Sequence, residues 1–270
     1  MSTASAVSVP SQCPERKEMR KALRRLEKHI KVLEPVHQFE IGSGSAEIDQ
    51  IRYLPMVLNE SSKDRPAFFT PLDRSCLLTP DNQYDQEYEV EYLAHESISE
   101  DGRDPKTCTQ AIDIYWDKYI SHYREGDKPL GSEVSPIYQE KVLWRHNFPE
   151  FGLYDIQQVK DGPYAHLKAT IYNNLNADDG HLLQGEMLLI LRLMLAHLKR
   201  GRFVEHMVVL VMVLSLVGPQ HARVIEAYSE GHTLVVRPSK LYDLRTKDPA
   251  TLKTLAQWFL GKPRAPTKTS

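Results

Sequence analysis

The apolar stretch 182–217 constrains the fold most, because so many apolar side chains have to be removed from water. From Leu182 to Leu198 they occupy nearly all faces of a helix, which is typical of a central buried helix. Gly201 favours termination of this helix. The Val-rich run from Met207 to Val217 has 11 residues, about half the length of a membrane span. This run is predicted to be a fully buried strand.

The residues after this strand predict the rest of the fold class. His221–Tyr228 and His232–Tyr242 flank Glu230-Gly231, which favours a hairpin. Asp248-Pro249 is a helix cap followed by proline, and apolar residues at helical spacing continue to Leu260. The order helix, strand, strand, strand, helix predicts an α+β fold with an antiparallel or mixed sheet. Because no βαβ alternation is present, a doubly wound dinucleotide-binding fold is not expected.

Residues 14–35 predict a basic amphipathic helix between two prolines. One apolar stripe recurs at spacings of 4, 3, 4 and 3, namely Met19, Leu23, Leu26, Ile30 and Leu33. Eight Lys and Arg residues cover the other faces. We expect this helix to pack on its own protein. Two further roles stay open, which are a contact with a protein partner or a second copy through residues 15–34, and a nucleic-acid-binding arm.

The remaining segments complete the predicted organisation. Residues 40–101 carry four Lys and Arg against 14 Asp and Glu, and six glycines and prolines interrupt their pattern. Within them Glu87–Tyr92 alternates acidic and apolar residues, which predicts a strand. Asp104-Pro105 predicts the start of a further helix. The predicted order is a disordered tail (1–13), the basic helix (14–35), an irregular acidic segment (36–103), an α+β globular core (104–261) and a loose tail (262–270).

Composition favours a soluble protein of a reducing compartment. Three widely spaced cysteines give no disulfide framework and no paired metal-ligand spacing. Residues 1–10 lack a cationic region followed by a long apolar run, so no secretory signal is expected. The net charge of -2 disfavours non-specific nucleic-acid binding. We therefore expect a cytoplasmic or nuclear protein without a membrane partner.

Motifs that carry chemistry are missing from the sequence. It contains no glycine-rich phosphate loop, no nucleophile elbow, no paired zinc-binding cysteines and no HExxH. Five histidines lie between residues 181 and 232, but none pairs with another ligand at metal-site spacing; they are His181, His197, His206, His221 and His232. No metal or cofactor is therefore expected.

The helix-strand-strand-strand-helix order resembles the core of PD-(D/E)xK nucleases. In those enzymes an acid on the second strand and an acid-x-lysine on the third hold a divalent metal. The resemblance implies Glu186, Glu226 and Lys240 as candidate catalytic residues, with a divalent cation as cofactor. Pro238 stands where the acid two residues before the lysine is required. The resemblance is therefore one of topology, and implies a degenerate relative more readily than an active nuclease.

Three sequence segments between about residues 140 and 261 resemble a group of uncharacterised filamentous-fungal proteins. They are Trp144–Asp155, His221–Tyr228 and Lys240–Arg245. This resemblance implies a fungal source and allows an accessory role in secondary-metabolite biosynthesis. Because no catalytic constellation accompanies the amphipathic helix, the sequence favours a non-catalytic binding or interaction protein.

Overall fold

The structure is a computed structural model, and it describes residues 14–41, 50–123, 130–132, 143–159, 165–199 and 209–264. The predictions for the tail 1–13, Gly201, His206 and residues 265–270 lie outside these ranges.

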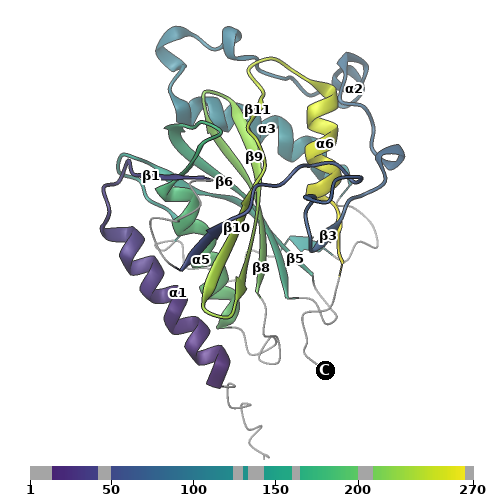
Figure 1. Cartoon of the computed structure of the whole chain (residues 1–270). Helices are drawn as coiled ribbons and strands as arrows, with labels where there is room; N and C mark the ends of the chain where they lie inside the picture. Colours follow the sequence, from purple (N-terminus) through teal and green to yellow (C-terminus); the bar gives the residue numbers. More distant parts are fainter. Residues whose placement is uncertain are drawn as a thin grey trace, which may run out of the picture.

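An eight-stranded mixed sheet forms the centre of the protein (Figure 1). Its strand order is β2-β10-β9-β8-β6-β5-β4, and β11 pairs separately with β9. The β6–β8 and β10–β2 pairs are parallel and the others are antiparallel. The strands are β2 (Ile51–Tyr53), β4 (Leu130–Ser132), β5 (Phe151–Val159), β6 (His166–Asn176), β8 (Leu210–Gly218), β9 (His221–Glu230), β10 (Thr233–Pro238) and β11 (Tyr242–Asp243).

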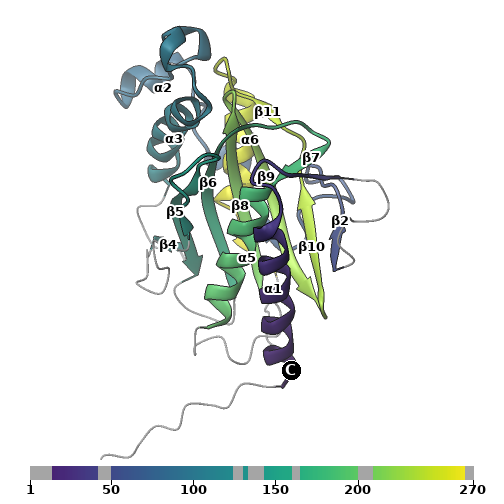
Figure 2. The same ribbon diagram turned by 90° about the vertical axis from the view of Figure 1, so that its left-hand side faces the viewer.

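Helices cover both faces of this sheet (Figure 2). One face carries α5 (Gln184–Leu198) and, packed on it, α1 (Pro14–Val32). The other face carries α3 (Pro105–Ser121) and α6 (Pro249–Phe259), with α2 (Asn82–Glu87) beside α3. Alternate residues of β8 enter the two cores, Val211 and Val213 on the α5 side and Met212 and Leu214 on the α3 side. The α+β prediction is therefore confirmed, and so is the fully buried strand from Leu210 to Val217, while Met207 and Val208 of the predicted run lie outside the described residues.

The C-terminal half follows the predicted order with small shifts of boundary. Residues 181–183 form β7 (His181–Leu183), which pairs with β1 (Gln38–Glu40), so α5 begins at Gln184 and not at Leu182. Gly231, with a φ of 58°, closes the predicted hairpin between β9 and β10.

The apolar stripe of α1 is buried inside the protein. Met19, Leu23, Leu26 and Ile30 belong to the same core as α5. The opposite side of α1 exposes six basic residues, which are Lys17, Lys21, Arg24, Arg25, Lys28 and Lys31. Among the described residues, no helix has both the length and the apolarity that a membrane crossing requires.

The predicted strand at Glu87–Tyr92 is wrong. Asp81 caps α2 by accepting from the backbone amides of Gln83 and Tyr84, and α2 ends at Glu87. Glu89 then has a φ of 50°, a turn conformation incompatible with a strand. The alternating pattern is not sufficient for a strand, because a strand also needs a neighbouring strand to pair with, and the pattern alone does not supply one.

Residues 36–103 also contribute short elements to the fold. Besides β1, β2 and α2 they form β3 (Phe69–Thr70), η1 (Arg74–Cys76), η2 (His95–Ser97) and η3 (Glu100–Gly102). β3 pairs with β12 (Lys262–Pro263), which lies where a loose tail was expected.

Candidate functional site

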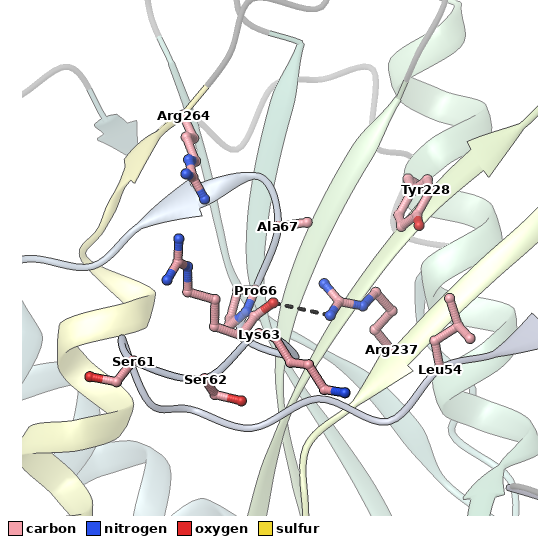
Figure 3. Close-up of a pocket in the computed structure, with 10 residues that line it drawn as sticks. Leu54, Ser61, Ser62, Lys63, Pro66, Ala67, Tyr228, Arg237 and Arg264 are labelled. Carbon is pink, nitrogen blue, oxygen red and sulfur yellow. Dashed lines mark hydrogen bonds between the residues drawn. The ribbon is translucent and has the colours of Figure 1, made fainter.

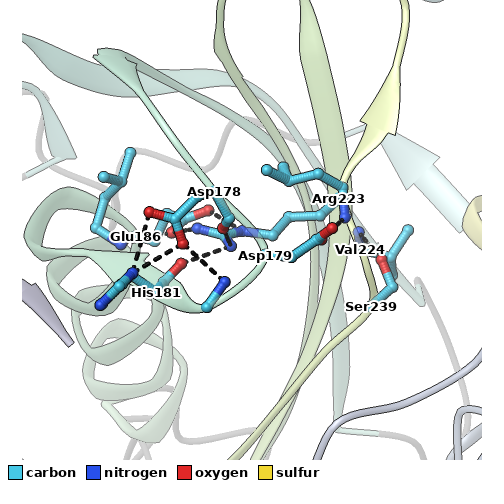
Figure 4. A network of polar contacts seen from close by, with 10 residues as sticks. Asp178, Asp179, His181, Glu186, Arg223, Val224 and Ser239 are labelled. Atoms are coloured by element: carbon cyan, nitrogen blue, oxygen red, sulfur yellow. Dashed lines mark hydrogen bonds and ion pairs between the residues drawn. The ribbon is translucent and has the colours of Figure 1, made fainter. Parts of the chain in front are cut away.

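Glu186, in the first turn of α5, forms a buried ion pair with Arg223. Its carboxylate accepts hydrogen bonds from Nε of Arg223, at 2.8 Å, and from Nη2 of the same residue. Both side chains are fully buried. It also accepts from the backbone amide of Leu183 at 2.8 Å. Arg223 Nη1 donates in addition to the backbone carbonyls of Asp178 and His181 (Figure 4). The pair ties the start of α5 to β9, and each charge has its partner.

Glu226 lies three residues further along β9 and faces the opposite side of the sheet. Its carboxylate accepts from Nη1 of Arg237 at 2.6 Å, and from the backbone amides of Ala67 and Phe68 at 3.0 Å each. Arg237 in turn donates from Nη2 to the backbone carbonyls of Asp64 and Arg65. This buried pair fastens the 64–68 loop to the β9–β10 hairpin.

The three residues implied by the nuclease resemblance do not meet. Val224 and Ile225 on β9 enter the cores on opposite faces, so Glu226 and Arg223, with its partner Glu186, are separated by the sheet. Lys240 is exposed, with Nζ 5.2 Å from the ring centroid of Tyr242. Within the described ranges no group of three or more His, Cys, Asp or Glu side chains is placed to hold a metal ion.

The described histidines of the 181–232 region are also apart. His181 Nδ1 contacts Asp178 at 2.8 Å, and His221 Nε2 lies 3.9 Å from Asp243. Burial lowers the pKa of the His221 imidazole. His197 is buried within α5, whereas His232 is exposed in the hairpin turn. Each is explained by its own local surroundings.

A basic pocket that the sequence did not suggest lies on the α6 side of β9 and β10. It has a volume of about 500 Å³. Its lining residues come from the 54–67 segment, the hairpin and the C-terminal end of the described chain; they are Leu54, Ser61, Ser62, Lys63, Arg65, Pro66, Ala67, Tyr228, Arg237 and Arg264 (Figure 3). Four are cationic, and none of these described lining residues is Asp or Glu.

Three of the four cations are not neutralised by a described carboxylate. Arg237 is paired with Glu226, but Lys63, Arg65 and Arg264 have no carboxylate within ion-pair distance in the described part of the chain. Arg65 donates one hydrogen bond from Nη1 to the backbone carbonyl of Glu60, at 2.5 Å. The pocket therefore concentrates uncompensated positive charge, which attracts anions.

Polar neutral groups complement these cations. The ring of Tyr228 packs edge-on against Phe68, with centroids 4.8 Å apart, and Tyr228 lines the pocket. Ser61 and Ser62 stand in the loop on its other side. Guanidinium, ammonium and hydroxyl donors together form the kind of donor set that binds phosphate oxygens.

A buried lysine holds the end of α6, a few residues before Arg264 in the chain. Lys168 on β6 donates from Nζ to the carbonyls of Trp258, Phe259 and Gly261, at 3.3, 2.6 and 2.5 Å. Burial lowers the pKa of Lys168 well below its usual value, but three acceptors at a helix C-terminus match the three N–H groups of the charged form. We therefore assign the protonated amine.

Lys168 fixes the end of α6, from which β12 continues. β12 pairs with β3, and the backbone amide of Arg264 donates to the carbonyl of Phe68 at 2.9 Å. Arg264 is thereby held at the rim of the pocket. Sequence patterns could not reveal this site, because its cations are spread from residue 63 to residue 264. The one local signal was Arg237, a charge within an otherwise apolar strand.

Comparison with protein-family models, with curated proteins and with solved structures found no match to this chain. The resemblances to a fungal protein group and to nuclease cores therefore stay predictions.

Proposed function

We propose that this protein is a non-catalytic binding protein whose basic pocket takes a phosphorylated small molecule. The observation that carries the proposal is the pocket of about 500 Å³ with four lining cations and, among its described lining residues, no acid. Its volume falls in the range of small-molecule sites, about 300–1,000 Å³. An anion there exchanges bulk water for charge-assisted hydrogen bonds, which are roughly twice as strong as neutral ones.

Titration calorimetry with inorganic phosphate tests this function. Arg264→Ala removes one uncompensated guanidinium and is expected to weaken binding about tenfold or more, since a hydrogen bond to a charged group contributes about 1.5–3 kcal/mol. Lys262→Ala is the matched control, because Lys262 is exposed and close in sequence but lines neither described cavity. Equal losses in the two variants would reject the proposal, and so would a failure of the unaltered protein to bind any of the phosphate compounds tested.

A second binding surface is favoured by the exposed side of α1. Its apolar stripe is used inside the protein, so a partner or second copy at residues 15–34 would meet the basic side. Lys17, Arg24, Arg25 and Lys28 have no carboxylate within ion-pair distance among the described residues. We propose an acidic protein surface as the partner. Light scattering at low and high salt tests the version with a second copy; a single-chain mass under both conditions would remove it.

Nuclease activity receives less support from the described residues. A PD-(D/E)xK-like nuclease needs carboxylates that converge, and Glu186 and Glu226 each hold a buried arginine on opposite faces of the sheet. An accessory role in secondary-metabolite biosynthesis, and a cytoplasmic or nuclear location, stay proposals based on the sequence.

A further inference from the structure

A second, smaller cavity adjoins the basic pocket. It has a volume of about 250 Å³ and is lined by Glu60, Arg65, Phe69, Thr70, Pro71 and Arg264. Arg65 and Arg264 line both cavities, so the two spaces are neighbours that share these two residues. A ligand anchored between these arginines can extend into either space.

The smaller cavity differs in chemistry from the larger one. It adds no cation beyond the shared arginines and contains the carboxylate of Glu60. Phe69 and Pro71 contribute apolar side chains to its lining, and the exposed residue Thr70 carries a hydroxyl. Glu60 accepts from Gln257 Nε2 at 3.3 Å, which leaves acceptor capacity on its carboxylate. This lining suits a neutral group that donates hydrogen bonds.

We propose that the ligand is a phosphate monoester of a hydroxylated small molecule. Its phosphate lies between Arg65 and Arg264 in the larger cavity, and its hydroxyl-bearing part enters the smaller cavity against Glu60 and Thr70. This inference rests on the proposed function and names the ligand class for the same site.

The Glu60 carboxylate selects this class over other phosphates. A diphosphate or a bisphosphate reaching into the smaller cavity would place a second anion beside Glu60, and like charges repel. Inorganic phosphate alone would leave the smaller cavity without a partner. A hydroxylated carbon skeleton supplies donors to Glu60 and Thr70 and some apolar surface to Phe69.

Calorimetry with three probes tests the inference, using the full chain with orthophosphate, pyrophosphate and ribose 5-phosphate. Ribose 5-phosphate is expected to bind about tenfold more tightly than orthophosphate. Thr70→Val is expected to reduce that ratio about threefold to fivefold, because one neutral hydrogen bond contributes a factor of this order. Thr246→Val, at an exposed threonine that lines neither cavity, is expected to leave the ratio unchanged.

Glu60→Gln supplies an independent readout. Removing the negative charge is expected to raise the affinity for pyrophosphate about threefold or more relative to orthophosphate. Equal binding of ribose 5-phosphate and orthophosphate, or ratios that neither variant changes, would overturn the ligand class and leave the phosphate pocket standing. If none of the three probes binds, the proposed function fails and the inference fails with it.

Discussion

Arg237 and Glu226 lie directly opposite each other in the antiparallel β9–β10 pair, and Arg237 Nη1 donates to Glu226 Oε2 over 2.6 Å. Both residues also bond to the 64–68 loop: the Glu226 carboxylate accepts from two of its backbone amides, and Arg237 Nη2 donates to two of its backbone carbonyls. A buried ion pair is weak evidence for stability by itself. Its consequence here is geometric, because the pair positions the loop segment that brings Lys63 and Arg65 to the lining of the pocket.

Glu226→Ala is expected to lower the free energy of unfolding by about 3–5 kcal/mol, since it leaves Arg237 charged, buried and unpaired. Urea unfolding measures this loss. The same variant is expected to weaken phosphate binding, because the 64–68 loop that carries Arg65 loses its attachment to β9, and this loss is expected to outweigh the removal of the negative charge beside Arg237. Glu230→Ala is the control on the same strand; Glu230 pairs with Arg52 at the surface, and a change within about 0.5 kcal/mol is expected. Similar losses for the two variants would contradict the positioning role.

Glu186 and Arg223 form the second buried pair, on the α5 face. Either Glu186→Met or Arg223→Met alone is expected to cost about 3–5 kcal/mol of unfolding free energy, because one buried charge is left without its partner. The double variant is expected to cost less than the sum of the two, by more than about 1 kcal/mol. Strict additivity in urea unfolding would argue against the pair.

The apolar stripe of α1 gives a third prediction. Leu26 is 3% exposed and packs in the core with α5, so Leu26→Ala is expected to lower the free energy of unfolding by about 2–5 kcal/mol. Val32, 82% exposed at the end of the same helix, supplies the comparison, and Val32→Ala is expected to change it by less than about 0.5 kcal/mol. A neutral Leu26→Ala would mean that the helix does not dock on its own protein.

Acid stability depends on the helix caps. Asp248 accepts from the Thr251 hydroxyl and from the backbone amides of Ala250 and Thr251, and these bonds lower its pKa. Because the folded-state pKa lies below the unfolded value of 3.8, the cap stabilises above that value and is lost as the pH falls through the folded pKa. Asp248→Ala is expected to cost about 1 kcal/mol at pH 7 and less near pH 2. Thermal unfolding at both pH values checks this, and an equal cost at both would contradict it.

The C-terminal fold was accessible to sequence reasoning because its signals are local. The Asp248-Pro249 cap, the turn at Gly231 and the apolar run of β8 each act over a few residues. β2 and β3 are only three and two residues long. They form because they pair with β10 and β12, which are distant in the sequence. No pattern of that length can predict such pairing.

The pocket could not be predicted for a similar reason. Glu226 is a carboxylate on a buried strand, and in a sequence such a residue looks the same whether it binds a metal or pairs with an arginine. The sequence does not show that Arg237 stands opposite Glu226 until the hairpin register is known. Arg264 reaches the site only through the pairing of β12 with β3.

Mapping by NMR tests directly whether the basic pocket is the site at which the protein binds a phosphorylated ligand. Backbone amide shifts of the isotopically labelled full chain would be followed as ribose 5-phosphate is added. Saturable shifts are expected in Ser61–Thr70 and at Arg264, with little change along α1 from Pro14 to Val32. Shifts confined to α1, or none in the 61–70 segment, would contradict the assignment of the basic pocket as the functional site.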